Sequence, residues 1–423
     1  MNKYFNIIVS FSTRIATSLC GFIVYGILAR NLSSEDFGFF TFTMILIPQL
    51  TILCGGGLHL ISSKKINIFK KNILKIKLLR SSLINLVLFT SIFLIIYYFT
   101  DVLNYLELNK MTSFIISLIL VSSFHRIISD YFRATNRFTY FSLFNSIGSG
   151  VGLLMWIFFT ISIVLLNKET ISVSNVFKCY LYSSLFVSII LIILIRNKLI
   201  LLPKLLKESF SSKFNETKDF LFQGYSLMMI NVTAGIINYF PAFFIFYLLS
   251  SEETGIFLSA QKIAMLILVP LSIVDISIPQ TIAKKFHENN NFLKYILKIS
   301  FIRFCMAFPI FASVILFSES IIVVVYGSDF LHIESIMKLL SFSLIPAFVF
   351  GPTRQLMTFT NNNLKLFFID LTLIAITLAL TIIFKNSINF ETFISYYVLI
   401  NILRFSFYFI FCIYLFRGIQ LNH

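Results

Sequence analysis

Charged residues are scarce in this chain. They make up 12% of the 423 residues, while 58% are hydrophobic and the mean hydropathy is +0.90. Soluble domains carry about 25% charged residues. The composition therefore excludes an ordinary soluble protein and indicates a membrane protein. A single Trp, Trp156, beside 52 Phe and 18 Tyr is typical of lipid-facing helices with tyrosine at the membrane interfaces.

The motifs of soluble catalysis and of metal binding are missing as well. The sequence has no phosphate loop with the Walker A spacing and no nucleophile elbow. Its five cysteines lie singly inside apolar runs, without a spacing suited to disulfides or metals, so buried thiols are expected. These are Cys20, Cys54, Cys179, Cys305 and Cys412. We expect no enzyme activity and no metal site.

Apolar windows of about 20 residues, long enough to cross a bilayer as helices, recur along the whole chain. The first has no small-residue cleavage site, so it is expected to be a span rather than a cleaved signal. Segment 318–332 is interpreted as a stretch that dips back into the interface. An all-α membrane protein of about twelve helices is predicted, with spans at 5–29, 38–61, 81–100, 111–132, 138–166, 176–195, 220–249, 255–283, 299–317, 333–353, 366–384 and 393–416.

Basic and acidic residues lie in alternate loops. Loops after even-numbered spans hold basic runs, from Lys64 to Arg80 and from Arg196 to Lys218, whereas loops after odd-numbered spans are mostly acidic. The positive-inside rule then places both termini in the cytoplasm. The net charge of +16 is explained by this topology and by lipid headgroups, so no nucleic-acid partner is expected.

A nine-residue phrase occurs twice. Residues 32–40 (LSSEDFGFF) are similar to residues 249–257 (LSSEETGIF), which lie 217 residues later (249 minus 32), about half of the chain away. In each copy a serine precedes an acidic residue by three positions, which is a capping box and predicts a helix start on the outer side. The repeat predicts two six-helix lobes related by an axis along the membrane normal, 1–197 and 220–423, joined by a cytoplasmic linker at 198–219.

Six basic residues lie deep inside the predicted spans or at their cytoplasmic ends, opposed there by three aspartates. A charge near the bilayer centre costs about 2.5–3.5 kcal/mol, so each is expected to face a cavity or a partner. The basic residues are Arg14, Arg126, Lys262, Arg303, Arg354 and Arg404, and the acidic ones are Asp130, Asp275 and Asp370. Arg303 and Arg354 lie near cytoplasmic helix ends, where snorkelling to the interface is the expected behaviour.

Polar stripes accompany several of these charges. Arg14 shares a helix face with serines and threonines, Lys262 follows Gly255 and Ser259 at helical spacing, and a third stripe runs from Asn231 through Asn238 to Pro241. We predict a water-filled cationic cavity between the lobes. The substrate-binding residues expected are Arg14, Lys262, Arg404, Asn231 and Ser259. The alternative for each charge is a snorkelling or ion-paired side chain.

Three titratable residues are candidates for ion coupling, and each has a structural alternative. His59 follows a glycine triplet and is otherwise an interface histidine. Asp130 is otherwise the partner of Arg126 in an ion pair within one helix. Asp275 lies between two prolines, in a predicted helix break of the kind that binds coupling ions in transporters.

Several short motifs bring a family resemblance. Residues 29–38 (ARNLSSEDFG) resemble the junction of helices one and two in the polysaccharide transporter family. These Wzx-type flippases of O-antigen and capsule units belong to the multidrug/oligosaccharidyl-lipid/polysaccharide exporter superfamily. Further similar stretches are 255–264 (GIFLSAQKIA), 326–330 (YGSDF), 358–363 (TFTNNN) and 133–137 (RATNR).

The resemblance implies a flippase of the bacterial cytoplasmic membrane. Its substrate would be an undecaprenyl-diphosphate-linked oligosaccharide, moved to the outer leaflet by alternating access under a proton or sodium gradient, without a cofactor. Arg14 and Lys262 would occupy basic positions of such transporters, with Lys262 where Arg is usual, which favours a point charge over a bidentate phosphate grip. Expected partners are membrane lipids and the polymerase and chain-length proteins of the pathway, around a monomer.

Three other functions are compatible with a helical membrane protein of this kind. A cation-coupled drug exporter of the same superfamily usually has an acidic lumen, whereas bases are in excess within these spans. An O-antigen polymerase or ligase typically carries one long outer loop, and all predicted outer loops here are short. A structural membrane scaffold would leave the many charges within the spans without a purpose.

Overall fold

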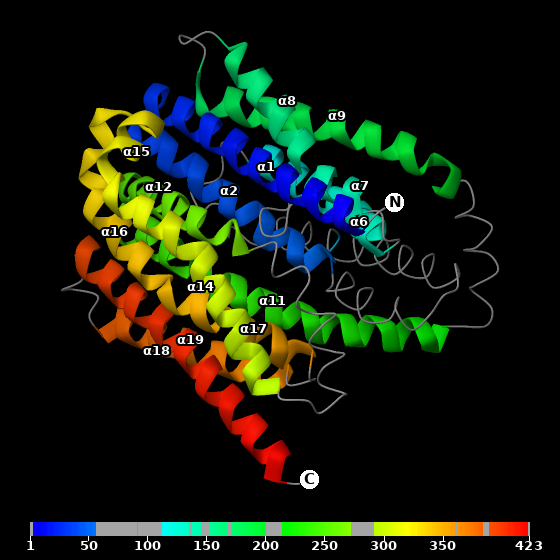
Figure 1. Ribbon diagram of the computed structural model, residues 1–423. Helices are drawn as coiled ribbons and strands as arrows, with labels where there is room; N and C mark the ends of the chain where they lie inside the picture. The colour runs from blue at the N-terminus through cyan, green and yellow to red at the C-terminus, as the bar shows by residue number, and fades with distance from the viewer. Residues whose placement is uncertain are drawn as a thin grey trace. The chain divides into compact units, whose positions relative to one another are not determined.

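The computed structural model describes residues 3–55, 91, 112–134, 138–144, 152–166, 171–199, 214–271, 292–359, 363–383 and 389–421. Every regular element within these ranges is an α-helix or a short 3-10 helix. The all-α prediction is therefore confirmed for the described part of the chain (Figure 1).

The chain divides into two compact units. The first holds Met1–Leu32 and Thr43–Val232, and the second holds Ser33–Phe42 and Thr233–His423. The boundary thus cuts two helices, α2 (Ser34–Gly55) and α11 (Phe214–Leu248). Most of the predicted linker 198–219 lies outside the described residues, so the predicted lobe boundaries stay predictions.

The first unit is built on α1, which packs against α7 and α8, while α6 packs against α7 and α9 (Figure 1). Trp156 lies at its centre, with ring centroids 6.3 Å from Tyr25 and 5.9 Å from Phe159. Its helices are α1 (Lys3–Asn31), α6 (Thr112–Ala134), α7 (Phe138–Phe144), α8 (Leu153–Val164) and α9 (Val173–Leu199), together with parts of α2 and α11.

In the second unit, α19 packs against α16, α17 and α18, while α14 packs against α17 and α12 packs against α16. Its helices are α12 (Ser251–Met265), η3 (Leu266–Leu268), α14 (Phe292–Leu316), α15 (Ser318–Val325), η4 (Ser328–Ile333), α16 (Glu334–Ser343), α17 (Ile345–Phe359), α18 (Asn363–Ile383) and α19 (Phe390–Leu421). The N-terminal turns of α2 and the C-terminal part of α11, from Thr233, complete it.

Helices lie on every predicted span except 81–100, of which the structure describes residue 91 alone. Two predicted spans are each divided between two helices. Span 138–166 holds α7 and α8, and span 333–353 is split at Leu344 between α16 and α17. The segment 318–332 forms the short helices α15 and η4. The count of twelve spans stays a prediction.

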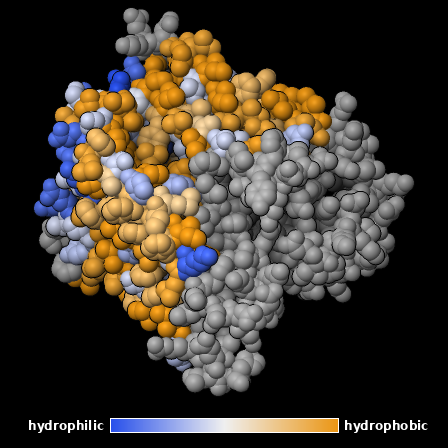
Figure 2. All heavy atoms as spheres, viewed as in Figure 1, coloured by the Kyte–Doolittle hydropathy of each residue, from blue (hydrophilic) through white to orange (hydrophobic). Residues whose placement is uncertain are grey.

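Six helical segments within the described residues are long and apolar enough to cross a membrane: Val173–Leu194, Met228–Leu248, Ile296–Leu316, Ser328–Gly351, Leu364–Ile383 and Phe390–Tyr414. Large apolar side chains are exposed along them, among them Phe301, Phe368 and Ile382. Apolar residues cover much of the described surface that is visible in Figure 2. Such a surface is suited to lipid rather than water, and the chain is a multi-pass membrane protein.

Both copies of the repeated phrase start a helix, as predicted. The backbone N–H of Asp36 donates to the Ser33 hydroxyl (3.2 Å), and that of Glu253 donates to the Ser250 hydroxyl (3.1 Å). Each serine thus satisfies one of the N–H groups that a helix N-terminus leaves without a partner. The capping interpretation of the phrase is confirmed.

The two copies also touch each other. Within the second unit, a Cβ atom added to Gly38 would overlap the carbonyl oxygen of Ser251, and one added to Gly255 would lie 3.0 Å from the Cα atom of Gly38. Glycine at both positions therefore allows the backbones of α2 and α12 to meet. Phe37, next to Gly38, packs edge-on against Tyr326 and Phe330.

Candidate functional site

A buried polar network lies inside the second unit. Its centre is a stripe on α19 in which Tyr397, Asn401, Arg404 and Tyr408 follow one another at helical spacing. All four side chains are less than 10% exposed. A polar stripe buried on an otherwise apolar helix is costly unless other helices supply its partners, and here three helices do so.

Arg404 is the hub of the network. Its Nε atom donates to Asp370 Oδ1 of α18 at 3.2 Å and to the Tyr408 hydroxyl at 3.0 Å, and its Nη1 atom donates to Asn238 Oδ1 of α11 at 2.7 Å. Arg404 is 2% exposed and Asp370 is fully buried. The guanidinium and the carboxylate form a buried salt bridge, so the two charges compensate each other away from water.

The Asp370 carboxylate is bonded on one side only. Its Oδ1 atom accepts from Arg404 and also from the Tyr408 hydroxyl. Its Oδ2 atom is buried and has no hydrogen-bond partner within the described residues. Buried carboxylate oxygens normally accept hydrogen bonds, so this oxygen is exceptional.

Asn238 connects the salt bridge to α12. Pro241 of α11 lacks an N–H group, which disturbs the helix around the preceding turn. In that turn the Asn238 carbonyl oxygen lies 3.4 Å from Gln261 Nε2 of α12 and 3.5 Å from the Tyr397 hydroxyl. Gln261 also donates to the Tyr397 hydroxyl at 3.2 Å. The network therefore joins α11, α12, α18 and α19.

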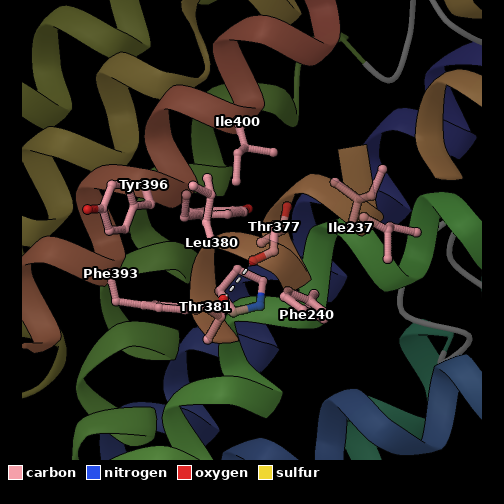
Figure 3. Close-up of a pocket in the computed structure, with 11 residues that line it drawn as sticks. Ile237, Phe240, Thr377, Leu380, Thr381, Phe393, Tyr396 and Ile400 are labelled. Atoms are coloured by element: carbon pink, nitrogen blue, oxygen red, sulfur yellow. Dashed lines mark hydrogen bonds between the residues drawn. The ribbon is translucent and has the colours of Figure 1, made fainter. Parts of the chain in front are cut away.

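A pocket adjoins this network between α11, α18 and α19. Figure 3 shows the labelled side chains converging on it from these three helices. Its lining is mainly apolar and aromatic, with the hydroxyl-bearing residues Thr377, Thr381, Tyr396 and Tyr397. Tyr397 belongs to both the pocket and the network, and Ile400 lies one turn before Arg404. The pocket therefore lies about one helical turn from the salt bridge.

The prediction that Arg303 snorkels to the interface is wrong. Arg303 of α14 is 5% exposed, and its guanidinium donates to the carbonyl oxygens of Phe348 (3.2 Å) and Ala347 (3.4 Å) in α17. Pro352, four residues after Phe348, has no N–H to donate to that carbonyl. The Arg303 guanidinium therefore replaces the backbone N–H that Pro352 lacks as the donor to the Phe348 carbonyl. Gly351 leaves room for it, because a Cβ atom at that position would meet the guanidinium.

The structure places the predicted substrate residues on four helices. Arg14 lies in α1, although its side chain is not described, and Lys262 is half-buried in the last turn of α12. The Asn231 Nδ2 atom and the fully buried Ser259 hydroxyl have no hydrogen-bond partner within the described residues. Arg404 is joined by hydrogen bonds to Asp370, Tyr408 and Asn238. The substrate-binding roles stay predictions.

The structure describes none of the side chains of the three ion-coupling candidates. His59 and Asp275 lie outside the described residues, and Asp130 lies in α6 with a side chain that is not described. Within the described residues, no cluster of His, Cys, Asp and Glu is suited to a metal ion. Asp370 was predicted only as a counter-charge. Its role in the network, with Gln261, Tyr397 and Tyr408, was missed.

One signal in the sequence points to this network. Tyr397, Asn401, Arg404 and Tyr408 fall at i, i+4, i+7 and i+11, which is a single face of a helix. The same criterion led to the stripe from Asn231 to Asn238. Tyrosines on a transmembrane helix are usually expected at the membrane interfaces. For that reason, Tyr397 and Tyr408 are not recognised from the sequence as members of a buried polar stripe.

Comparison with known proteins decides the family. The family model described as "Polysaccharide biosynthesis protein" matches residues 5–275, more than half of the chain. The chain belongs to the polysaccharide biosynthesis protein family. The resemblance found in the short motifs is thereby confirmed at the level of the family. Among curated proteins, none matches the chain in sequence.

Solved transporters of the MOP superfamily share the fold. A multidrug resistance MATE family transporter in an inward-facing conformation is 13% identical, with a TM-score of 0.73 over 98% of this chain and 99% of that one. An outward-facing MATE structure is 14% identical, with a TM-score of 0.66 over 97% of each chain. A MOP superfamily transporter from Pyrococcus furiosus Vc1, described as having a binding pocket of reverse polarity, has a TM-score of 0.64 at 12% identity over 98% and 95%. The chain therefore has a MATE-like fold.

Proposed function

We propose that this polysaccharide biosynthesis family protein is a flippase. It moves an undecaprenyl-diphosphate-linked oligosaccharide, an O-antigen or capsule repeat unit, from the cytoplasmic to the outer leaflet of the bacterial cytoplasmic membrane, with both of its termini in the cytoplasm. The observation that carries the proposal is the family match over residues 5–275. A step of polysaccharide biosynthesis that needs a polytopic membrane protein of this fold is the transfer of its lipid-linked units across the bilayer.

The fold supports a transport cycle of the alternating-access type. MATE structures similar to this chain were solved in inward-facing and outward-facing conformations, so the architecture is compatible with two states of access. A switch between two such states moves a bound group across the membrane without a continuous pore. An ion gradient then supplies the free energy.

The charge of the chain supports an anionic substrate. Deep in the predicted spans or at their cytoplasmic ends, six basic residues oppose three aspartates, and one of those aspartates, Asp370, is already paired with Arg404. The remaining excess of positive charge suits a diphosphate and acidic sugars better than an organic cation. In the proposal, Arg14 and Lys262 attract the diphosphate, while the polyprenyl chain stays in lipid.

A deletion strain tests the proposal. Loss of the gene is expected to remove surface polysaccharide and to leave lipid-linked repeat units on the cytoplasmic leaflet, measured by leaflet-specific labelling of the sugar. Unchanged delivery to the outer leaflet in the deletion strain would overturn the proposal.

Complementation assigns the role of Arg14. Arg14→Ala is expected to insert into the membrane but to restore no surface polysaccharide. Arg30→Ala is a matched control, because Arg30 lies on the same helix but is exposed near its end. Full complementation by Arg14→Ala would remove this residue from the substrate site.

A cation-coupled multidrug exporter is the second candidate, because the similar solved structures include MATE transporters. It predicts that the deletion strain becomes more sensitive to cationic drugs while its surface polysaccharide remains normal. The flippase proposal predicts the reverse on both counts.

A further inference from the structure

We propose that Asp370 is the residue that takes up the driving proton, and that its protonation changes the cluster of Asp370, Arg404 and Tyr408 from a charge-balanced state to a cationic one. The inference rests on the proposed function, which requires an ion gradient but gives it no site in the described residues. It places energy coupling inside the second unit, at a residue other than His59, Asp130 and Asp275.

The geometry around Asp370 leaves one place for a proton. Two donors already approach Oδ1, from Arg404 and from Tyr408, whereas Oδ2 is buried and has no partner within the described residues. An ionised carboxylate has about four lone-pair sites to satisfy, and a buried oxygen without a donor carries a desolvation cost. A proton on Oδ2 removes the negative charge from that unsatisfied oxygen, but it also leaves the buried Arg404 guanidinium without its counter-charge, so the protonated form is the higher-energy state of the cluster.

The neighbouring groups favour a proton over a metal ion. The helices that pack against α18 are α17 and α19. From α19, Arg404 and Tyr408 face the carboxylate, and α17 carries Arg354. The Asn238 Oδ1 atom already accepts from Arg404. A metal ion needs several oxygen ligands at once, while these neighbours are mostly donors or cations, and a proton needs only one oxygen.

Protonation has a defined consequence for the network. The carboxylate gains one proton and forms one O–H bond, so the Asp370–Arg404 pair passes from zero net charge to +1. The salt bridge that ties α18 to α19 becomes a weaker hydrogen bond between the charged guanidinium and a neutral carboxyl group, whereas the Arg404–Asn238 bond between α19 and α11 does not involve the carboxyl group. Two charge states then favour two relative arrangements of these helices, which is how protonation drives a conformational switch.

The adjoining pocket lies close to the salt bridge. Ile374, one turn after Asp370 on α18, and Ile400, one turn before Arg404 on α19, both line it. Tyr397, which lines the same pocket, continues the polar network toward Asn238. The salt bridge therefore lies about one helical turn from the pocket lining.

Infrared difference spectroscopy on the purified, full-length protein tests the site directly. Acidification is expected to produce the carbonyl stretch of a protonated carboxyl group. This band should disappear in Asp370→Asn and persist in Asp329→Asn, a control at an exposed aspartate in η4. An unchanged band in Asp370→Asn would overturn the proposal.

Isotope labelling keeps the test decisive if Asp370→Asn does not fold. Wild-type protein that carries ¹³C only at the side-chain carboxyl of aspartate should show the same band at lower frequency, which restricts it to aspartates. The conservative variant Asp370→Glu should then lose the isotope shift, because its carboxyl is unlabelled. A titrating band that ignores aspartate labelling would refute the assignment.

A transport assay separates this inference from the proposed function. In proteoliposomes loaded with lipid-linked repeat units extracted from the source strain, a gradient of one pH unit changes the equilibrium distribution about tenfold per coupled proton. Wild type should show this response and Asp370→Asn should lose it. No transport by wild type, with the infrared band intact, would refute the flippase function alone. Transport with an unaltered pH response in Asp370→Asn would refute the proton site alone.

Discussion

The buried salt bridge between Asp370 and Arg404 gives the sharpest energetic prediction. Arg404→Met leaves a carboxylate buried without its counter-charge, and Asp370→Leu leaves a guanidinium in the same condition. Each single substitution is expected to lower the free energy of unfolding by about 3–5 kcal/mol, because an uncompensated buried charge is costly. Both partners are 3% exposed or less, so solvent screening offers little relief.

The double variant should lose much less than the two single variants together. With both charges gone, the remaining cost comes from the Asn238 amide and the Tyr408 hydroxyl, which each lose a partner at about 1–3 kcal/mol. The middle of these ranges gives a coupling energy of about 4 kcal/mol between the two sites. Equilibrium unfolding in mixed micelles measures all four proteins of the cycle.

A second cycle provides the control. Lys338 and Glu334 form an ion pair of 2.6 Å along α16, and their side chains are 39% and 24% exposed. Exposed pairs of this kind contribute at most about 1 kcal/mol. If the Asp370–Arg404 cycle were additive to within about 0.5 kcal/mol, the claim that these two charges compensate each other would be refuted.

Three further variants test other contacts by the same unfolding measurement. Gly38→Ala should lower the free energy of unfolding by about 1–3 kcal/mol, because its methyl group overlaps the α12 backbone. Gly21→Ala, whose methyl group meets only Trp156 at 3.8 Å, should leave it unchanged or raise it by up to about 1 kcal/mol. Equal losses in the two variants would disprove the close contact. Ser250→Ala should cost about 1 kcal/mol by removing the N-cap of α12, and no loss would mean that the cap contributes nothing. Arg303→Met should cost about 1–3 kcal/mol by leaving the carbonyl of a proline-broken turn without a donor, while wild-type stability would favour the snorkelling interpretation after all.

The tests differ in what they depend on. The unfolding cycles concern only contacts that the structure describes, and they stand whatever the substrate is. The deletion strain concerns the substrate class, and the infrared band concerns the proton. Agreement among all three would connect a buried ion pair to a transport cycle.

Local signals in the sequence determined much of the architecture. Long apolar runs become helices because a bilayer offers no hydrogen-bond partner to the backbone, so the chain must satisfy it internally. The serines of the repeated phrase start helices because their hydroxyls accept from N–H groups three residues on. These are short-range effects, and they can be predicted from neighbouring residues alone. The family resemblance rests on equally short stretches.

The tertiary structure alone decided which polar residues meet. Arg404 binds Asp370 from 34 positions away and Asn238 from 166 positions away. Helical periodicity fixes which residues share a face, but it does not fix which faces of different helices pack together. For the same reason Arg303, placed by its depth in a span, was expected at the interface, whereas α17 offers it a free carbonyl. The sequence by itself determined a helical membrane protein of this family, and only the packing of α11, α18 and α19 placed a half-satisfied carboxylate beside an arginine.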